Sequence, residues 1–153
     1  MIEVTLALGL VSFCLIALLG LLPAGLQTVK ETQERSAAAN CLEKITEAIR
    51  NAPASGGKYT ALGNYSTLSW SMGGAPVTSI FTNISITGDP VSFTTDQRLT
   101  AYVKIVPPTD ALSSGSAQIS VAWPNRATWN TGASAWSHSL GSLSTWMIFT
   151  STP

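Results

Sequence analysis

Residues 3–30 read EVTLALGLVSFCLIALLGLLPAGLQTVK, in which one acid is followed by 26 uncharged residues before the first lysine. A helix of about 20 apolar residues is long enough to cross the hydrocarbon core of a bilayer. A carboxylate in hydrocarbon costs several kcal/mol unless a nearby group neutralises it. Glu3 therefore needs a specific partner, and a positive group on another copy of the chain is the most economical one.

We expect the apolar run to be retained and not removed as a leader. A secretory signal begins with basic residues and ends at a small-residue cleavage site, whereas this chain has Glu3 in front and no Lys or Arg before position 30. Pro23 lacks the amide hydrogen that a helix needs, and Gly20 and Gly25 flank it. We therefore predict a transmembrane or filament-core helix over residues 1–29, with a kink or a locally unwound stretch at residues 20–25.

The helical pattern continues past the apolar run but becomes amphipathic over residues 30–53. Charged residues occupy the other faces of this segment, and we interpret them as a solvated surface and not as a site. Pro53 disfavours helical geometry at the residue before it, so the helix is predicted to end near residues 50–53. Such a helix is far longer than those of most globular domains, so it needs support from outside its own domain. The apolar or small positions with helical spacing are Val29, Ala38, Leu42, Ile45, Ile49 and Ala52.

From residue 54 onward, apolar and polar residues alternate with the period of two that is typical of β-strands. The predicted fold class is α+β, with a helix over about residues 1–52 packed on a small antiparallel β-sheet head formed by residues 54–153. A loop rich in Pro and Ser separates the first two strong strands, which most simply form an antiparallel pair. We expect strong strands at residues 99–105, 117–123 and 143–149, and weaker ones at 67–72, 77–87 and 91–95.

The composition is neutral and poor in charge. Charged residues make up 10% of the chain, against about 25% in an average soluble domain, and eight acids balance eight bases. Nothing in this balance attracts nucleic acid or anionic lipid. A neutral surface has little of the self-repulsion that keeps monomers apart. The composition therefore suits a protein that packs against copies of itself.

No set of residues indicates catalysis, a metal or a cofactor. His138 is the single histidine, which leaves no histidine cluster for zinc. The aspartates of the second half lie in turn-rich sequence without the spacing of a calcium loop. The sequence contains no phosphate-binding glycine loop, nucleophile elbow or H-E-x-x-H motif. We expect a protein that is not an enzyme and that needs no cofactor.

The two cysteines are not expected to form an intramolecular disulfide. Cys14 and Cys41 both fall in the predicted helix, which would hold them about 40 Å apart. A disulfide needs Cα atoms within about 7 Å. We interpret both as small buried hydrophobic residues, with an intersubunit bridge or a lipidation site as the alternative.

Tryptophans are concentrated in residues 123–146, WPNRATWNTGASAWSHSLGSLSTW. Trp129 and Trp136 lie among small polar residues, where their rings could stack on a saccharide or contact another subunit. The competing interpretation is packing, because one Trp buries up to about 250 Å² in a small head. Asn64 (NYS) and Asn83 (NIS) match the acceptor pattern for N-glycosylation, a pattern that also arises by chance in a chain rich in Ser and Thr.

The opening segment, MIEVTLALGLVSFCLIALLGLLPAGLQ, resembles the N-terminal segment of the type IV pilin and type II secretion pseudopilin superfamily, most closely its minor-pseudopilin or PilV-like branch. The resemblance is specific over about residues 1–30 and rests on architecture beyond them. It implies a pilin-like subunit that is made in the bacterial inner membrane, trimmed by a prepilin peptidase and polymerised by pilus or secretion machinery into an extracellular filament at the cell surface. It also implies that Glu3 pairs with the N-terminal amine of a neighbouring subunit, so Met1 and Glu3 would form the assembly contact.

In that superfamily the acid is the fifth residue of the mature chain, whereas here it is the third. Either two further residues precede Met1 or the mature end is shorter, and pairing across subunits is geometrically possible in both cases. We predict a homo-oligomeric helical filament in which this chain is a structural subunit. Two alternatives remain: a minor pseudopilin that primes or tips a secretion pseudopilus, and a singly anchored periplasmic module for binding or adhesion.

Overall fold

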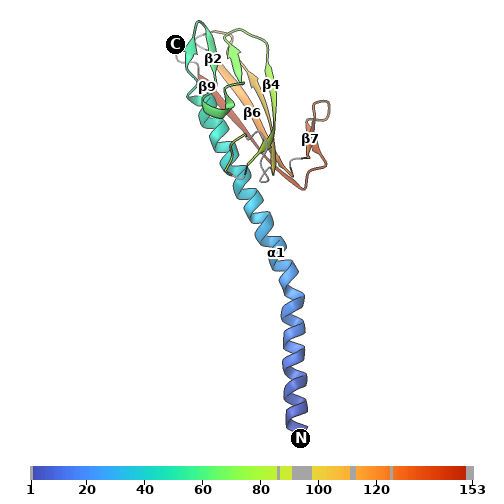
Figure 1. Ribbon diagram of the computed structural model, residues 1–153. Coiled ribbons are helices and arrows are strands. Elements are labelled where there is room, and N and C mark those ends of the chain that lie inside the picture. Colours follow the sequence, from blue (N-terminus) through green and yellow to red (C-terminus); the bar gives the residue numbers. More distant parts are fainter. Residues whose placement is uncertain (1, 86, 91–97, 111–112, 125, 151–153) are drawn as a thin grey trace. The chain divides into compact units, whose positions relative to one another are not determined.

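The protein is α+β: one long N-terminal helix is followed by antiparallel β-sheets (Figure 1). This confirms the predicted class and the order of its parts. The elements are α1 (Ile2–Arg50), β1 (Ala54–Ser55), β2 (Lys58–Thr60), the 3₁₀ turn η1 (Gly63–Tyr65), β3 (Ser69–Ser71), β4 (Val77–Ile84), β5 (Leu99–Val106), β6 (Ser114–Trp123), β7 (Thr128–Asn130), β8 (Ala135–Ser137) and β9 (Gly141–Thr150).

The chain divides into two compact units, Met1–Gln33 and Glu34–Pro153. The division falls inside the predicted amphipathic segment 30–53. Met1 and the candidate strand at residues 91–95 lie outside the described residues. The computed structural model describes residues 2–85, 87–90, 98–110, 113–124 and 126–150.

α1 is one uninterrupted helix, and its end at Arg50 confirms the stop predicted from Pro53. The locally unwound stretch predicted at residues 20–25 is wrong, because these residues are α-helical throughout. Pro23 removes a single backbone hydrogen bond, the one that its nitrogen would make to the carbonyl of Leu19. The turns on both sides keep their own hydrogen bonds, so a proline can bend a long helix without unwinding it.

In the second unit, α1 packs one face against a four-stranded sheet, which we call the main sheet (Figure 1). Three of the predicted apolar positions, Ala38, Ile45 and Ile49, are buried there, and Leu42 is partly buried. This confirms that the helix is amphipathic in this part. The buried stripe of α1 consists of Ala37, Ala38, Cys41, Ile45, Ala48 and Ile49.

The main sheet has the strand order β4-β5-β6-β9, and every neighbouring pair is antiparallel. The expected pairing of the first two strong strands is confirmed, since β5 and β6 pair from Thr100↔Ala122 to Val106↔Ser116. The third strong strand is β9, which pairs with β6 over ten residues. Alternate residues of the central strands point toward α1 and form the core, as their apolar period predicts: Ala101, Val103, Ile105, Ala117, Ile119 and Val121.

A second sheet of three short strands, β1-β2-β3, closes the core beside α1. It begins with a tight hairpin, in which Gly56 and Gly57 both have positive φ, the conformation that a two-residue hairpin loop of this kind requires. Its aromatic residues connect it to the main sheet. Trp70 stacks on Tyr59 at 5.9 Å between ring centroids and meets Phe149 of β9 edge-on at 5.7 Å. The two sheets and one face of α1 therefore share one core.

Candidate functional site

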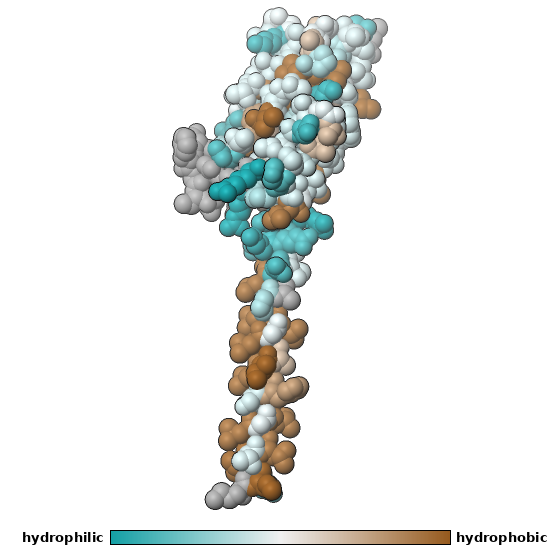
Figure 2. Space-filling model, turned by 90° about the vertical axis from the view of Figure 1, so that its right-hand side faces the viewer, coloured by the Kyte–Doolittle hydropathy of each residue, from teal (hydrophilic) through white to brown (hydrophobic). Residues whose placement is uncertain are grey.

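The first unit exposes apolar side chains around the whole circumference of α1. Over Ile2–Val29 the large hydrophobic residues are 54–78% exposed. The most apolar 18-residue stretch of the helix has no buried residue. Figure 2 shows the large hydrophobic residues as brown side chains on both sides of a pale stripe that runs along the helix. By length and composition this helix can cross a membrane. We call this surface the apolar helix surface; it consists of Ile2, Val4, Leu6, Leu8, Leu10, Val11, Phe13, Leu15, Ile16, Leu18, Leu19, Leu21, Leu22, Leu26 and Val29.

The few polar groups within this surface are arranged to suit an apolar environment. The hydroxyl of Thr5 donates to the carbonyl of Ile2 at 2.9 Å, and that of Ser12 donates to the carbonyl of Leu8 at 2.8 Å. Such bonds to the helix's own backbone satisfy a hydroxyl without water. Glu3 lies exposed in the first turn, where the helix dipole favours a negative charge. Glu3 is the single charged residue among residues 2–29.

The predicted packing residues all lie on the same exposed helix. A Cβ atom added at Gly20 or Gly25 would meet nothing within 4 Å in this chain, and Pro23 is exposed between them. Cys14 is exposed and Cys41 is buried, and both are free thiols. The interpretation of two buried cysteines is therefore right for Cys41 and wrong for Cys14, which is exposed on a stretch of α1 whose described neighbours are exposed too.

In the second unit, a polar cluster holds the turn before Pro90 against α1. The Lys44 ammonium donates to the Asp89 carboxylate at 2.7 Å, and the Tyr65 hydroxyl donates to the carbonyl of Gly88 at 2.5 Å. Gly88 has φ +82°, and a Cβ there would lie 3.0 Å from the Cα of Cys41. Only glycine allows this close approach in this conformation. We call Lys44, Tyr65, Gly88 and Asp89 the turn clasp.

The sequence did not predict the turn clasp. Its pattern favoured a solvated helix face for Lys44. The side chain of Lys44 is 42% exposed, yet it forms an ion pair with Asp89, 45 residues away. The hydrogen bond from Lys44 holds the pKa of Asp89 below its usual value of 3.8. The sequence shows a turn motif at Gly88-Asp89-Pro90, but this motif does not indicate that Lys44 is the partner of Asp89.

Replacing Asp89 by Asn is expected to reduce the loss of stability in acid. The pKa of Asp89 is lower in the folded than in the unfolded chain, so its contribution is present above the unfolded value near 3.8 and is lost as the pH falls through the folded value. The effect is modest, because the pair is partly exposed. Urea unfolding of the detergent-solubilised chain between pH 7 and pH 2 measures it. Identical pH profiles for the wild type and Asp89→Asn would contradict the pairing.

Cys41 is expected to resist thiol reagents in the folded protein at pH 8. Burial raises the pKa of this thiol to about 11, although a contact with the Tyr65 hydroxyl at 3.8 Å opposes the shift. The reactive thiolate is therefore scarce as well as inaccessible. Maleimide labelling of a Cys14→Ser variant, with and without denaturant, checks this. Labelling of the native variant as fast as of the unfolded one would show that the core around Cys41 is open.

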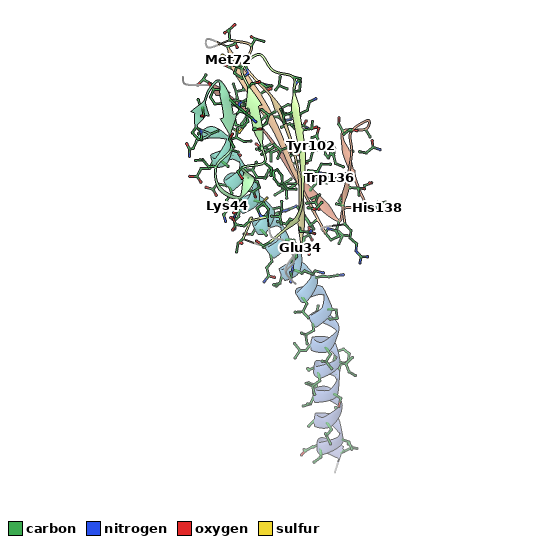
Figure 3. All side chains as sticks on the ribbon, turned by 45° about the horizontal axis from the view of Figure 1, so that its top comes forward. Glu34, Lys44, Met72, Tyr102, Trp136 and His138 are labelled. Atoms are coloured by element: carbon green, nitrogen blue, oxygen red, sulfur yellow. The ribbon has the colours of Figure 1, made fainter. Side chains whose placement is uncertain are left out.

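Trp129 and Trp136 are brought together by a hairpin that the sequence did not predict, β7-β8, in which they are direct cross-strand partners. Trp129 stacks on Tyr102 of β5 at 4.2 Å and meets Trp136 edge-on at 5.1 Å. The Trp136 indole donates to the hydroxyl of Ser120 at 2.7 Å, which in turn shares a hydrogen bond with Ser144. Figure 3 labels Tyr102 on the main sheet and Trp136 on the hairpin.

These contacts pin the hairpin onto the face of the main sheet that points away from α1. Both indoles are partly buried, and the indole N–H of Trp129 is buried with no hydrogen-bond partner in the described part of the chain. One ring face of Trp129 is already covered by Tyr102. The arrangement is what packing produces, and the saccharide and subunit-contact roles of the two residues stay predictions.

The two asparagines of the glycosylation pattern differ in their surroundings. Asn64 is exposed in η1, and its amide donates to Asp89 at 3.4 Å. Asn83 is partly buried near the end of β4, with φ +63°, where the pairing with β5 shifts register. Across the described ranges, no group of three or more His, Cys, Asp or Glu side chains is placed to hold a metal ion.

Comparisons with protein-family models, with curated proteins and with solved structures found no match for this chain. Its function is therefore inferred from its residues and their geometry.

Proposed function

We propose that this chain is a structural subunit of an extracellular pilin-like filament, which polymerises through the apolar helix surface while a neighbouring subunit's N-terminus neutralises Glu3. The observation that carries the proposal is the exposure of large apolar side chains on every side of α1 over Ile2–Val29. A helix that is apolar all round is stable only where it is surrounded by lipid or by protein. A membrane supplies the first environment before assembly, and a bundle of such helices supplies the second.

The free energy of leaving the membrane has to come from specific contacts. Aliphatic side chains gain little when they move from lipid tails into a protein core, so close packing and relief of buried charge are the available sources. Gly9, Gly20 and Gly25 present no side chain and leave open space beside the helix. Neighbouring helices can approach closely at these positions.

Glu3 supplies the electrostatic contribution to the free energy of this assembly. Placed in the first turn of α1 and ahead of an uncharged stretch, it is costly in a lipid or protein interior unless a cation lies beside it. The first lysine of the same chain lies 27 residues later, on the order of 40 Å along a helix. The N-terminal amine of another copy is the cation that a parallel bundle of these helices brings to the same level.

Purification of surface filaments tests the proposed function. Filaments sheared from cells that produce the chain are imaged, and their subunits and mature N-termini are identified by mass spectrometry. Abundant filaments made of this chain would support the proposal. Trace amounts in a filament made of another protein would favour the minor-pseudopilin alternative, and material found in membranes alone would favour the anchored module.

A further inference from the structure

The two edge strands of the main sheet, β4 and β9, have the composition of strands that pair with a neighbour on both sides. Among the described residues, β9 pairs only with β6, and the stretch of β4 before Asn83 pairs only with β5. Neither β9 (GSLSTWMIFT) nor β4 (VTSIFTNI) contains a charged residue or a proline. Soluble proteins ordinarily protect exposed edges with such residues. These two edges carry no protection of that kind.

Both edges also expose large apolar side chains on the same face of the sheet. The register Ile80↔Tyr102↔Ser120↔Ser144 puts Ile80 of β4 on the face that carries Ser144. Trp146 and Ile148 follow Ser144 on that face, because side chains alternate along a strand. Ile80 is 52% exposed, Trp146 67% and Ile148 77%. Within the described part of the chain, β9 therefore has both an edge without a partner strand and an exposed apolar pair, Trp146 and Ile148.

We propose that β9 of one copy pairs with β4 of the next copy, so that the main sheets of neighbouring subunits join into one continuous sheet. This inference rests on the proposed function and names the head contact of that filament. The occupant is a second copy, because each edge offers the other an antiparallel partner strand. Both strands are uncharged, and both carry apolar side chains on the same face of the sheet.

Strand directions decide between the possible pairings. In a filament all copies have the same polarity, which excludes a two-fold pairing of β9 with β9. Because successive strands of the main sheet alternate in direction, β4 and β9 of one chain run in opposite directions. A neighbour displaced sideways with the same polarity therefore presents its β4 antiparallel to β9. Such a head-to-tail contact leaves a free edge at each end and can propagate without limit.

The space beside β9 accommodates an added strand. A hollow of about 630 Å³ lies between α1 and β9, lined among others by Leu42, Thr46 and Thr145. The side chains of an added β4 that point toward α1 are Val77, Ser79 and Phe81, which are half-buried in their own chain. With Ile80 opposite Trp146, Phe81 lies opposite Thr145, at the wall of this hollow. On the opposite face, Ile80 of the added strand comes opposite Trp146, an aromatic and β-branched pair of the kind that stabilises antiparallel strands. That register places Thr82 opposite Ser144.

Cysteine cross-linking within assembled filaments tests the pairing. Thr82→Cys and Ser144→Cys are introduced singly and together into a Cys14→Ser chain, and a short bismaleimide is added to the filaments. The chain with both cysteines is expected to give a ladder of covalent oligomers, and each single variant is expected to stay monomeric. Ser66→Cys, at an exposed position after η1, combined with Thr82→Cys is the matched control and should give no ladder.

The outcomes separate this inference from the proposed function. Dimers of the Ser144→Cys variant alone would indicate β9-β9 pairing and overturn the inference, and so would filaments in which no variant cross-links. Both results would leave the filament function standing, whereas absence of any assembly would contradict both. Hydrogen exchange on the unsubstituted chain is independent of these variants. The amides on the free edge of β9 should exchange more slowly in filaments than in detergent-solubilised monomers, and equal exchange would also overturn the pairing.

Discussion

Replacing Glu3 by Ala or Lys is expected to leave the head folded and to abolish filaments or shift their subunit register. In the proposed assembly, alanine removes the charge that would pair with the neighbouring N-terminus, and lysine replaces that attraction by repulsion. Glu3 belongs to the first compact unit of the chain and the head to the second. Filament yield by electron microscopy and near-ultraviolet circular dichroism of the solubilised chain measure the two effects separately.

Glu31→Ala is the matched control for this experiment. Glu31 is also an exposed acid of α1, but it lies beyond the uncharged stretch, so its removal should leave the filament yield unchanged. Glu3→Asp keeps the charge and should retain part of the yield. Normal filament yield from both Glu3→Ala and Glu3→Lys would contradict the proposed role of Glu3.

Ile45→Ala is expected to destabilise the head by about 2–5 kcal/mol, the usual cost of truncating a fully buried aliphatic side chain. Ile45 has no exposed surface and lies at the centre of the stripe that α1 packs against the main sheet. The cavity left by the substitution cannot refill easily, because strands of two sheets fix its walls. Urea unfolding of the detergent-solubilised chain, followed by tryptophan fluorescence, gives the change in the free energy of unfolding.

Ile148→Ala removes the same atoms from a side chain that is 77% exposed. In the solubilised monomer it should change the stability by no more than about 0.5 kcal/mol. A cost at Ile148 equal to that at Ile45 would show that the burial pattern described for the head is wrong.

Periodicity in the sequence predicted the larger elements because burial repeats along them. The period-two runs ending in Ile105, Trp123 and Phe149 are strands of the main sheet, and the stripe through Ala38, Ile45 and Ile49 is the buried face of α1. Pro53 marked the end of the helix correctly. In each case the local pattern and the tertiary packing agree, so a single sequence is enough to predict the helix or strand.

The features that the sequence did not predict depend on contacts between distant residues. The β7-β8 hairpin has three residues in each strand, too few to show a period, and it is held by Tyr102 and Ser120 of the main sheet. The ion pair of Lys44 with Asp89 joins residues that nothing local connects. The locally unwound stretch predicted around Pro23 is wrong, because a single lost hydrogen bond does not break a helix that has many others.

The apolar helix surface could be predicted from composition, whereas the edge strands of the main sheet could not. An uncharged stretch of 26 residues behind one acid identifies the helix and its charge without any structure. Among the described residues, β4 and β9 are edge strands, which became apparent only from the strand order, since a sequence does not reveal which strands lie at the edge of a sheet.

Electron cryo-microscopy of the purified filament tests the central claim most directly. The account predicts a core made of α1 helices from neighbouring copies, with the Glu3 carboxylate within about 4 Å of an N-terminal amine of another subunit, the distance of an ion pair. A filament in which α1 lies outside the core, or preparations in which the chain is found as a membrane-bound monomer and never in a filament, would contradict it.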